Sequence, residues 1–138
     1  YELTTLSAHR TPHRVMKLAE GAKKRGIKVI IAGAGMAAHL PGVVAAFTTL
    51  PIIGVPIKAG NSPGGLDAVL AILQMPPGVP VATVAINGSR NAGILAAQII
   101  GAGDPEVAEK LANFKEKMRE KVETLADEVE EKGYKAML

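Results

Sequence analysis

The sequence has no cysteine and no tryptophan, and only two tyrosines and two phenylalanines stand among its 138 residues. Without cysteine there is no disulfide, no thiol nucleophile and no cysteine-ligated zinc site. The aromatic residues are too few for a platform on which single-stranded nucleic acid stacks its bases. No apolar run approaches the roughly 18 residues of a membrane-spanning helix. These absences favour a cytoplasmic protein with a core of Ala, Val, Ile and Leu.

Acidic residues are scarce in the first three quarters of the chain. Residues 1–103 carry nine Lys or Arg and three Asp or Glu, whereas residues 104–138 carry seven and ten. A basic body beside an acidic tail indicates an anionic ligand for the body, with a solvated basic surface as the alternative. The basic residues are scattered and no nucleic-acid-binding motif accompanies them, so we expect no nucleic-acid partner.

Short apolar runs alternate with stretches of helical spacing. The predicted strands are Glu2–Leu6, Lys28–Ala32, Ile52–Val55 and Val81–Ile86. The predicted helices between and after them are Pro12–Lys24, Ala37–Thr48, Gly65–Gln74 and Arg90–Ile100. The strands are continuous apolar runs, which is typical of burial on both faces. The pattern therefore predicts an α/β fold, a parallel sheet with helices on both faces.

The last segment is predicted to be one long helix. Between Asp104 and Lys132 only Pro105 is a helix breaker, and it occupies a favourable first-turn position after an Asp cap. Apolar residues recur every three or four positions, and Gly133 ends the pattern.

This helix bears on domain organisation and assembly. We expect residues 1–103 to form the α/β core and residues 104–138 to be a helical extension of the same domain. A helix of this length overhangs a small domain, so part of its apolar stripe is expected to pack on another subunit. The alternative is a helix that lies wholly on its own sheet.

A parallel α/β sheet binds its ligand beyond the carboxyl ends of its strands, where three segments fall. The first is the segment 7–12, which supplies Ser7, His9 and Arg10. An arginine can hold a phosphate through two parallel hydrogen bonds, and a histidine titrates near neutrality and can move a proton. The alternative for this segment is a helix cap with a surface arginine.

The second segment, 33–42, is rich in small residues, which let a ligand approach the backbone closely. Its glycine spacing does not match a dinucleotide fingerprint and no acidic ribose-binding residue follows, which excludes a nicotinamide cofactor. His39 lies in the first turn of the following helix, whose dipole disfavours the cationic imidazole. His39 is either a ligand contact or a packed residue.

The third segment, 58–67, has the composition of a mobile lid with glycine hinges. Asp67 at its end is interpreted as a helix cap, with a lid contact as the alternative.

Five stretches together resemble the class I 5-(carboxyamino)imidazole ribonucleotide mutases of purine biosynthesis. They are SAHRTP at 7–12, AGAGMAAHLPG at 32–42, GLDAVLAILQMPPGVPVATVAI at 65–86, NAGILAAQI at 91–99 and EEKGYKAML at 130–138. The resemblance covers essentially the whole chain.

The resemblance implies a three-layer flavodoxin-like domain assembled into a homo-octamer. It also implies an enzyme that moves a carboxylate from the exocyclic nitrogen of a phosphorylated aminoimidazole ribonucleotide to its ring carbon. The reaction is expected to proceed by decarboxylation and recapture of the carbon dioxide, without metal, ATP or organic cofactor.

The resemblance also implies roles for individual residues. His9 matches the general acid/base of the family, and His39, close by, is the second candidate catalytic residue. The candidate substrate-binding residues are Ser7, Arg10, Ala34, Gly35 and Leu40. The first two match positions that hold phosphate and ribose, and the other three match positions around the base and carboxylate.

The chain departs from the family pattern in three places. Tyr1 aligns with the second strand of the family fold, so the first strand, its phosphate loop and the first helix have no counterpart. We expect either another segment to fill that slot in the sheet or a truncated or engineered form that binds nucleotide weakly and turns over poorly. Met36 stands where glycine is common, and the stretch 59–64 is slightly longer than usual.

Two other functions remain open at this point. One is a catalytically silent oligomeric scaffold, which the absent phosphate loop and Met36 favour. The other is a related carboxylase-like protein of nickel-pincer cofactor synthesis, although such proteins lack an intact SAHR followed by AAHLPG.

Overall fold

A computed structural model describes residues 1–134 and divides the chain into two compact units. The first unit is Tyr1–Ile99, and the second begins at Ile100. The last stretch of the family resemblance, at 130–138, ends outside the described residues. None of the helices within 1–134 is both long enough and apolar enough to cross a membrane.

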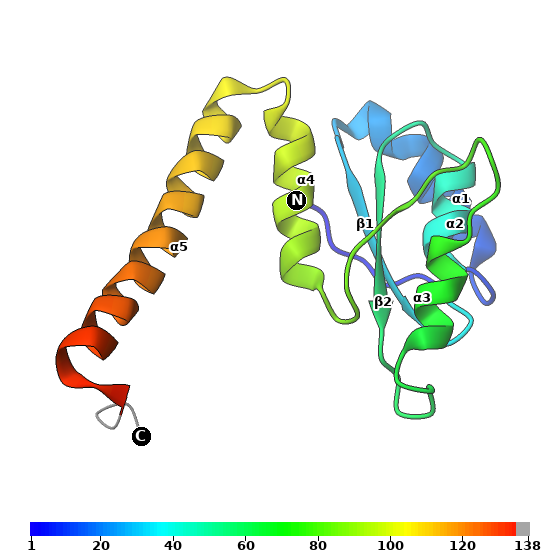
Figure 1. Ribbon diagram of the computed structural model, residues 1–138. Helices are drawn as coiled ribbons and strands as arrows, with labels where there is room; N and C mark the ends of the chain where they lie inside the picture. The colour runs from blue at the N-terminus through cyan, green and yellow to red at the C-terminus, as the bar shows by residue number, and fades with distance from the viewer. Residues whose placement is uncertain (135–138) are drawn as a thin grey trace. The chain divides into compact units, whose positions relative to one another are not determined.

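Strands and helices alternate along the chain (Figure 1). The elements are α1 (Pro12–Ala22), the 3-10 turn η1 (Lys23–Arg25), β1 (Ile30–Gly35), α2 (Leu40–Ala46), β2 (Ile52–Ile57), α3 (Leu66–Leu73), β3 (Ala82–Thr83), α4 (Ser89–Gly101) and α5 (Pro105–Lys132). The sheet order is β1-β2-β3 and both pairings are parallel. The prediction of a parallel α/β fold is confirmed.

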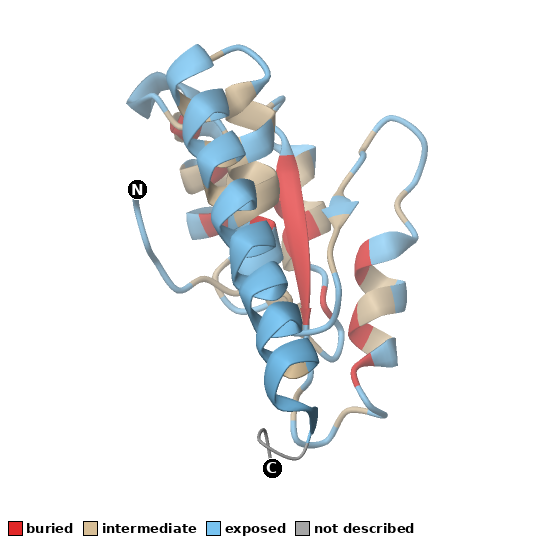
Figure 2. Ribbon diagram, turned by 60° about the vertical axis from the view of Figure 1, so that its left-hand side comes forward, coloured by how far each residue is buried: buried red, intermediate tan, exposed pale blue. Residues whose placement is uncertain are grey.

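β2 lies at the centre of the sheet and is covered on both faces, as its red colour in Figure 2 shows. On one face Ile52 packs in a cluster with Val15 of α1 and Val44 of α2. On the other face Ile53 and Val55 cluster with Ala92 of α4. Adjacent β2 residues thus point to opposite layers, which gives the three-layer, flavodoxin-like arrangement that the continuous apolar runs indicate.

β1 has a partner on one side only. Ala32 is buried, but Ile31 is 44% exposed, and no residue within 1–134 pairs with the edge of β1 that faces away from β2. The predicted strand Glu2–Leu6 is wrong, because these residues form no strand and Leu3 is 91% exposed. A β-branched or apolar run becomes a strand only where a neighbouring strand pairs with it, and this run has no such neighbour.

Several other element bounds differ from the prediction, among them the following three. The strand predicted at 28–32 is Ile30–Gly35, because it continues opposite β2 as far as Ile57. The strand predicted at 81–86 shortens to Ala82–Thr83, and the chain then turns at Asn87, where φ is 57°. The helix predicted from Ala37 begins at Leu40, after two tight turns.

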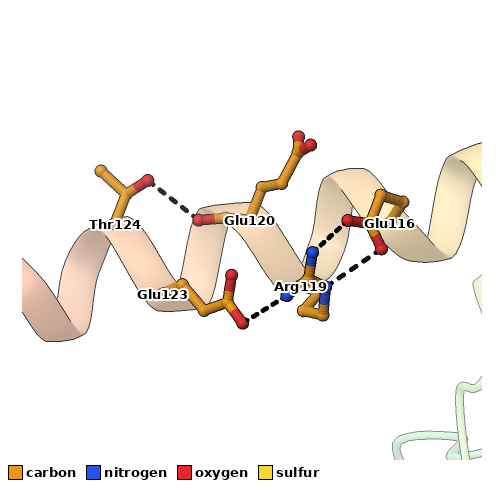
Figure 3. A network of polar contacts seen from close by, with 5 residues as sticks. All are labelled: Glu116, Arg119, Glu120, Glu123 and Thr124. Atoms are coloured by element: carbon orange, nitrogen blue, oxygen red, sulfur yellow. Dashed lines mark hydrogen bonds and ion pairs between the residues drawn. The ribbon is translucent and has the colours of Figure 1, made fainter.

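α5 has the predicted ends. The Asp104 side chain accepts a hydrogen bond from Val107 N at 3.2 Å, and Gly133 is the C-cap with φ 72°. Halfway along the helix, Arg119 bonds to Glu116 and to Glu123 (Figure 3). The Arg119 hydrogen bond lowers the pKa of the Glu116 carboxyl, and the two glutamates raise the pKa of Arg119.

Candidate functional site

The first site segment is a tight turn that leads into α1. Ser7 N donates to Thr11 Oγ1 at 2.9 Å, and Thr11 Oγ1 donates to the Ser7 carbonyl at 3.1 Å. Thr11 occupies the N-cap position of α1, but its side chain makes no capping hydrogen bond. Its hydroxyl instead closes the turn that presents His9 and Arg10, so the segment is not a simple helix cap.

Two histidines meet at this turn. His9 Nε2 lies 2.8 Å from His39 Nδ1, and the ring centroids are 5.0 Å apart in an edge-to-face arrangement. The hydrogen bond joins the turn before α1 to the start of α2, and the two histidines are thirty residues apart in the sequence. His39 is the N-cap residue of α2 and is exposed, so it is not a packed core residue.

A pocket of about 410 Å³ lies beside the His9 turn and the carboxyl end of β1. Its lining contains one guanidinium and, among the described residues that form it, no carboxylate. The lining residues are Leu6, Ser7, Ala8, His9, Arg10, Gly33, Ala34, Gly35, Met36, Ala37 and Leu40. The structure thus brings together six of the seven predicted site residues in one lining, and His39 joins them through His9.

Two backbone features shape the side of the pocket that β1 forms. A Cβ atom on Gly35 would lie 2.8 Å from the Ile57 carbonyl oxygen and 3.5 Å from Ala59 Cβ, so only glycine fits between β1 and the end of β2. Met36 has φ 55°, a left-handed conformation in which glycine carries no strain. Met36 is one of the residues that line the pocket.

Two hydrogen bonds tie the third segment to the start of α3. Ser62 Oγ accepts a hydrogen bond from Gly65 N at 2.7 Å and donates to Asp67 Oδ1 at 2.6 Å. The N-cap of α3 is Gly65, and Asp67 lies within the first helical turn. The interpretation of Asp67 as the helix cap is therefore wrong. The backbone N–H at the start of α3 bonds to the Ser62 hydroxyl, and Asp67 accepts a hydrogen bond from that hydroxyl.

Sequence comparison now decides between the open possibilities. The AIR carboxylase family matches residues 1–121. The chain belongs to the AIR carboxylase family. It is 56% identical over all 138 residues to the N5-carboxyaminoimidazole ribonucleotide mutase of Thermotoga maritima, of which it covers 80%. It is 54% identical to the enzyme of that name from Pyrococcus horikoshii, of which it covers 77%.

Longer AIR carboxylase relatives and a solved structure agree with this assignment. The phosphoribosylaminoimidazole carboxylase of Saccharomyces cerevisiae is 55% identical over 138 residues, which are 24% of that protein. The crystal structure of Treponema denticola PurE matches 91% of this chain and 75% of its own, with a TM-score of 0.69 and 25% identity. These relatives favour an enzyme over a silent scaffold or a nickel-pincer protein.

Sequence reasoning missed Asn87, which contacts the third segment. Its side-chain Oδ1 accepts a hydrogen bond from Lys58 N at 3.0 Å, next to Ala59, which lies against Gly35. The Asn87-Gly88 dipeptide is a turn signal that marks this position, but a turn signal does not reveal which strand the side chain contacts.

Proposed function

We propose that this chain catalyses the N5-carboxyaminoimidazole ribonucleotide mutase reaction. The observation that carries the proposal is the 2.8 Å contact between His9 Nε2 and His39 Nδ1 beside a pocket of small residues. The substrate is a phosphorylated aminoimidazole ribonucleotide that carries a carboxylate on its exocyclic nitrogen.

The reaction requires one proton to change places. Cleavage of the nitrogen–carboxylate bond releases carbon dioxide and leaves an electron pair on the nitrogen, which takes up a proton. The ring carbon then attacks the carbon dioxide and loses its own proton. A single imidazole that gives a proton to nitrogen and removes one from carbon balances both steps, and His9 has that role.

The histidine pair prepares His9 for this exchange. A hydrogen bond between two imidazoles needs an N–H on one ring and a lone pair on the other, so one proton lies between His9 and His39. Addition of a proton to both rings would place two N–H groups against each other. His39 therefore fixes the orientation of the His9 ring.

The remaining pocket residues fit the substrate. Arg10 supplies the charge and the paired donors for the phosphate. The Ser7 hydroxyl accepts a hydrogen bond from the backbone N–H of Arg10 at 3.2 Å. It keeps its own proton to donate to phosphate or ribose. Ala34, Gly35 and Leu40 provide an apolar wall beside the base and carboxylate. The bound substrate displaces water from this wall, so that the released carbon dioxide stays in place.

The proposal extends to a homo-octamer that works in the cytoplasm, where ribonucleotide precursors are made. Support for assembly comes from apolar side chains that the single chain leaves exposed. On α3, Leu66, Leu70 and Leu73 lie on one exposed face, and on α5 Val122 and Leu125 are exposed. Light scattering of the purified protein tests the subunit number.

The activity test uses a matched pair of histidine variants. We expect His9→Asn to lower kcat by about 10²- to 10⁴-fold, the usual contribution of a general acid/base. His13→Asn is the control, because His13 is exposed in the first turn of α1 and does not line the pocket. The assay follows product formation from the carboxyamino substrate. A wild-type chain without turnover, or an H9N variant as fast as H13N, contradicts the proposal.

A further inference from the structure

Asn87 makes one hydrogen bond to the end of β2 and one to the residue that follows the strand. Its backbone N–H donates to the Pro56 carbonyl at 2.8 Å, and its side-chain Oδ1 accepts from Lys58 N at 3.0 Å. The two bonds flank Ile57, the final residue of the strand. Asn87 lies beyond the end of β3, so it contacts β2 where regular strand pairing has already ended.

These two bonds reproduce the pattern of a parallel ladder. In such a ladder one residue donates to the carbonyl that precedes its partner and accepts from the N–H that follows it. The Asn87 backbone carbonyl is not available for the second bond, because the left-handed φ of 57° turns it toward Ser89 N at 2.9 Å. The side-chain amide oxygen takes its place.

Between Val84 and Asn87, the segment that follows β3 contains one residue more than the facing part of β2. Val84 N donates to the Gly54 carbonyl at 3.2 Å, and the next bond is Asn87 N to Pro56, so three steps on one side match two on β2. An inserted residue of this kind bends a strand and redirects a side chain, and it is common beside active sites. Here it directs the Asn87 amide at Lys58.

The anchored segment forms part of the wall behind the pocket. The Ile57 carbonyl lies 2.8 Å and Ala59 Cβ 3.5 Å from the point where a Gly35 side chain would begin. Gly35 lines the pocket that contains His9 and Arg10. The path from Asn87 to the pocket is therefore continuous, through Lys58 and Ala59 to Gly35.

We propose that Asn87 is a positioning residue, whose side-chain amide holds the exit of β2 against Gly35 and so fixes the wall of the pocket. The inference rests on the proposed function only for its kinetic consequence. Within residues 1–134 Asn87 hydrogen-bonds to neither histidine and does not line the pocket, so its effect passes through the backbone of residues 57–59.

Two substitutions separate the hydrogen bond from the backbone turn. Asn87→Gly keeps the left-handed conformation without strain but removes the acceptor. Asn87→Asp keeps an acceptor oxygen at the same place, and Asp is also tolerated in this conformation. We expect N87G to lower kcat/KM by about five- to tenfold, the effect of one neutral hydrogen bond, and N87D to remain within about twofold of wild type.

The separate effects on kcat and KM distinguish a positioning role of Asn87 from general destabilisation of the fold. In N87G we expect kcat to fall more than KM rises, because the Arg10 and Ser7 contacts with the phosphate do not depend on Asn87. The second readout is hydrogen exchange of the Lys58 amide, measured on the whole chain. We expect it to be about tenfold faster in N87G, and amides of the β1–β2 ladder to keep their rates.

The outcomes of this experiment are distinct. N87G with wild-type kcat/KM, or with an unchanged Lys58 exchange rate, overturns the inference. A wild-type chain without turnover contradicts the proposed function, and the exchange measurement then still decides whether Asn87 fixes the exit of β2. If N87G does not fold, N87D provides the test, because it keeps an acceptor oxygen for the Lys58 amide. Exchange of that amide clearly faster in N87D than in wild type would overturn the inference.

Discussion

The contact between β1 and the exit of β2 gives a quantitative prediction for Gly35→Ala. A Cβ at this position would lie 2.8 Å from the Ile57 carbonyl oxygen, closer than Cβ and backbone oxygen atoms approach each other in folded proteins. Neither neighbour is the flexible end of a side chain, because the second contact is Ala59 Cβ at 3.5 Å. The two strands must therefore separate at their carboxyl ends.

Overpacking of this kind costs about 1–3 kcal/mol of the free energy of unfolding. For a chain of this size, such a loss lowers Tm by roughly 3–10 °C. Gly33→Ala is the matched control in the same strand, because a Cβ there lies 3.5 Å from Ile57 Cδ1, at an ordinary van der Waals distance. We expect Gly33→Ala to change the free energy of unfolding by less than about 1 kcal/mol, in the stabilising direction.

Urea unfolding followed by far-ultraviolet circular dichroism measures both variants. The expected result is a lower midpoint for G35A at an unchanged slope, and a midpoint for G33A at or above that of wild type. Equal midpoints for the two alanine variants would refute the reasoning, because both substitutions add the same methyl group to the same strand.

Two further predictions concern Met36 and the α5 network. Met36→Gly removes a left-handed non-glycine residue, so we expect the free energy of unfolding to rise by about 1 kcal/mol in urea, and a lower midpoint would contradict this. Arg119→Gln removes the donor that lowers the Glu116 pKa, so we expect a carboxyl NMR titration to show that pKa rising toward its ordinary value. A lowered carboxyl pKa stabilises the helix above the unfolded-state pKa, and this is lost as the pH falls through the lowered value. Acid therefore weakens α5 in wild type through this pair, and R119Q lacks that part of the pH dependence.

Local signals were enough to predict α5. The Asp104 cap, the apolar spacing and Gly133 each act within a few residues, and all three have the predicted roles. The ends of parallel strands meet at one edge of a sheet, which places Gly35 at the end of β1 beside the residues that follow β2. His9 lines the same pocket as Gly35 although residues 2–6 form no strand, so strand order alone does not predict that contact.

The errors arise where structure depends on a distant partner. Residues 2–6 have the composition of a strand, but strand formation needs an adjacent edge, which composition does not report. The bond from Lys58 N to Asn87 joins residues twenty-nine positions apart, and the side chain substitutes there for a backbone carbonyl. Nothing in either local sequence specifies that contact.

The unpaired side of β1 has a consequence for self-association. Backbone donors and acceptors on that side have no partner strand within residues 1–134, and Ile31 beside them is 44% exposed. Such an edge is a template for strands of other molecules, and β1 carries no lysine, proline or other charged side chain that would block their approach. Intermolecular aggregation at high concentration is therefore expected to begin at this one strand, through backbone pairing between molecules.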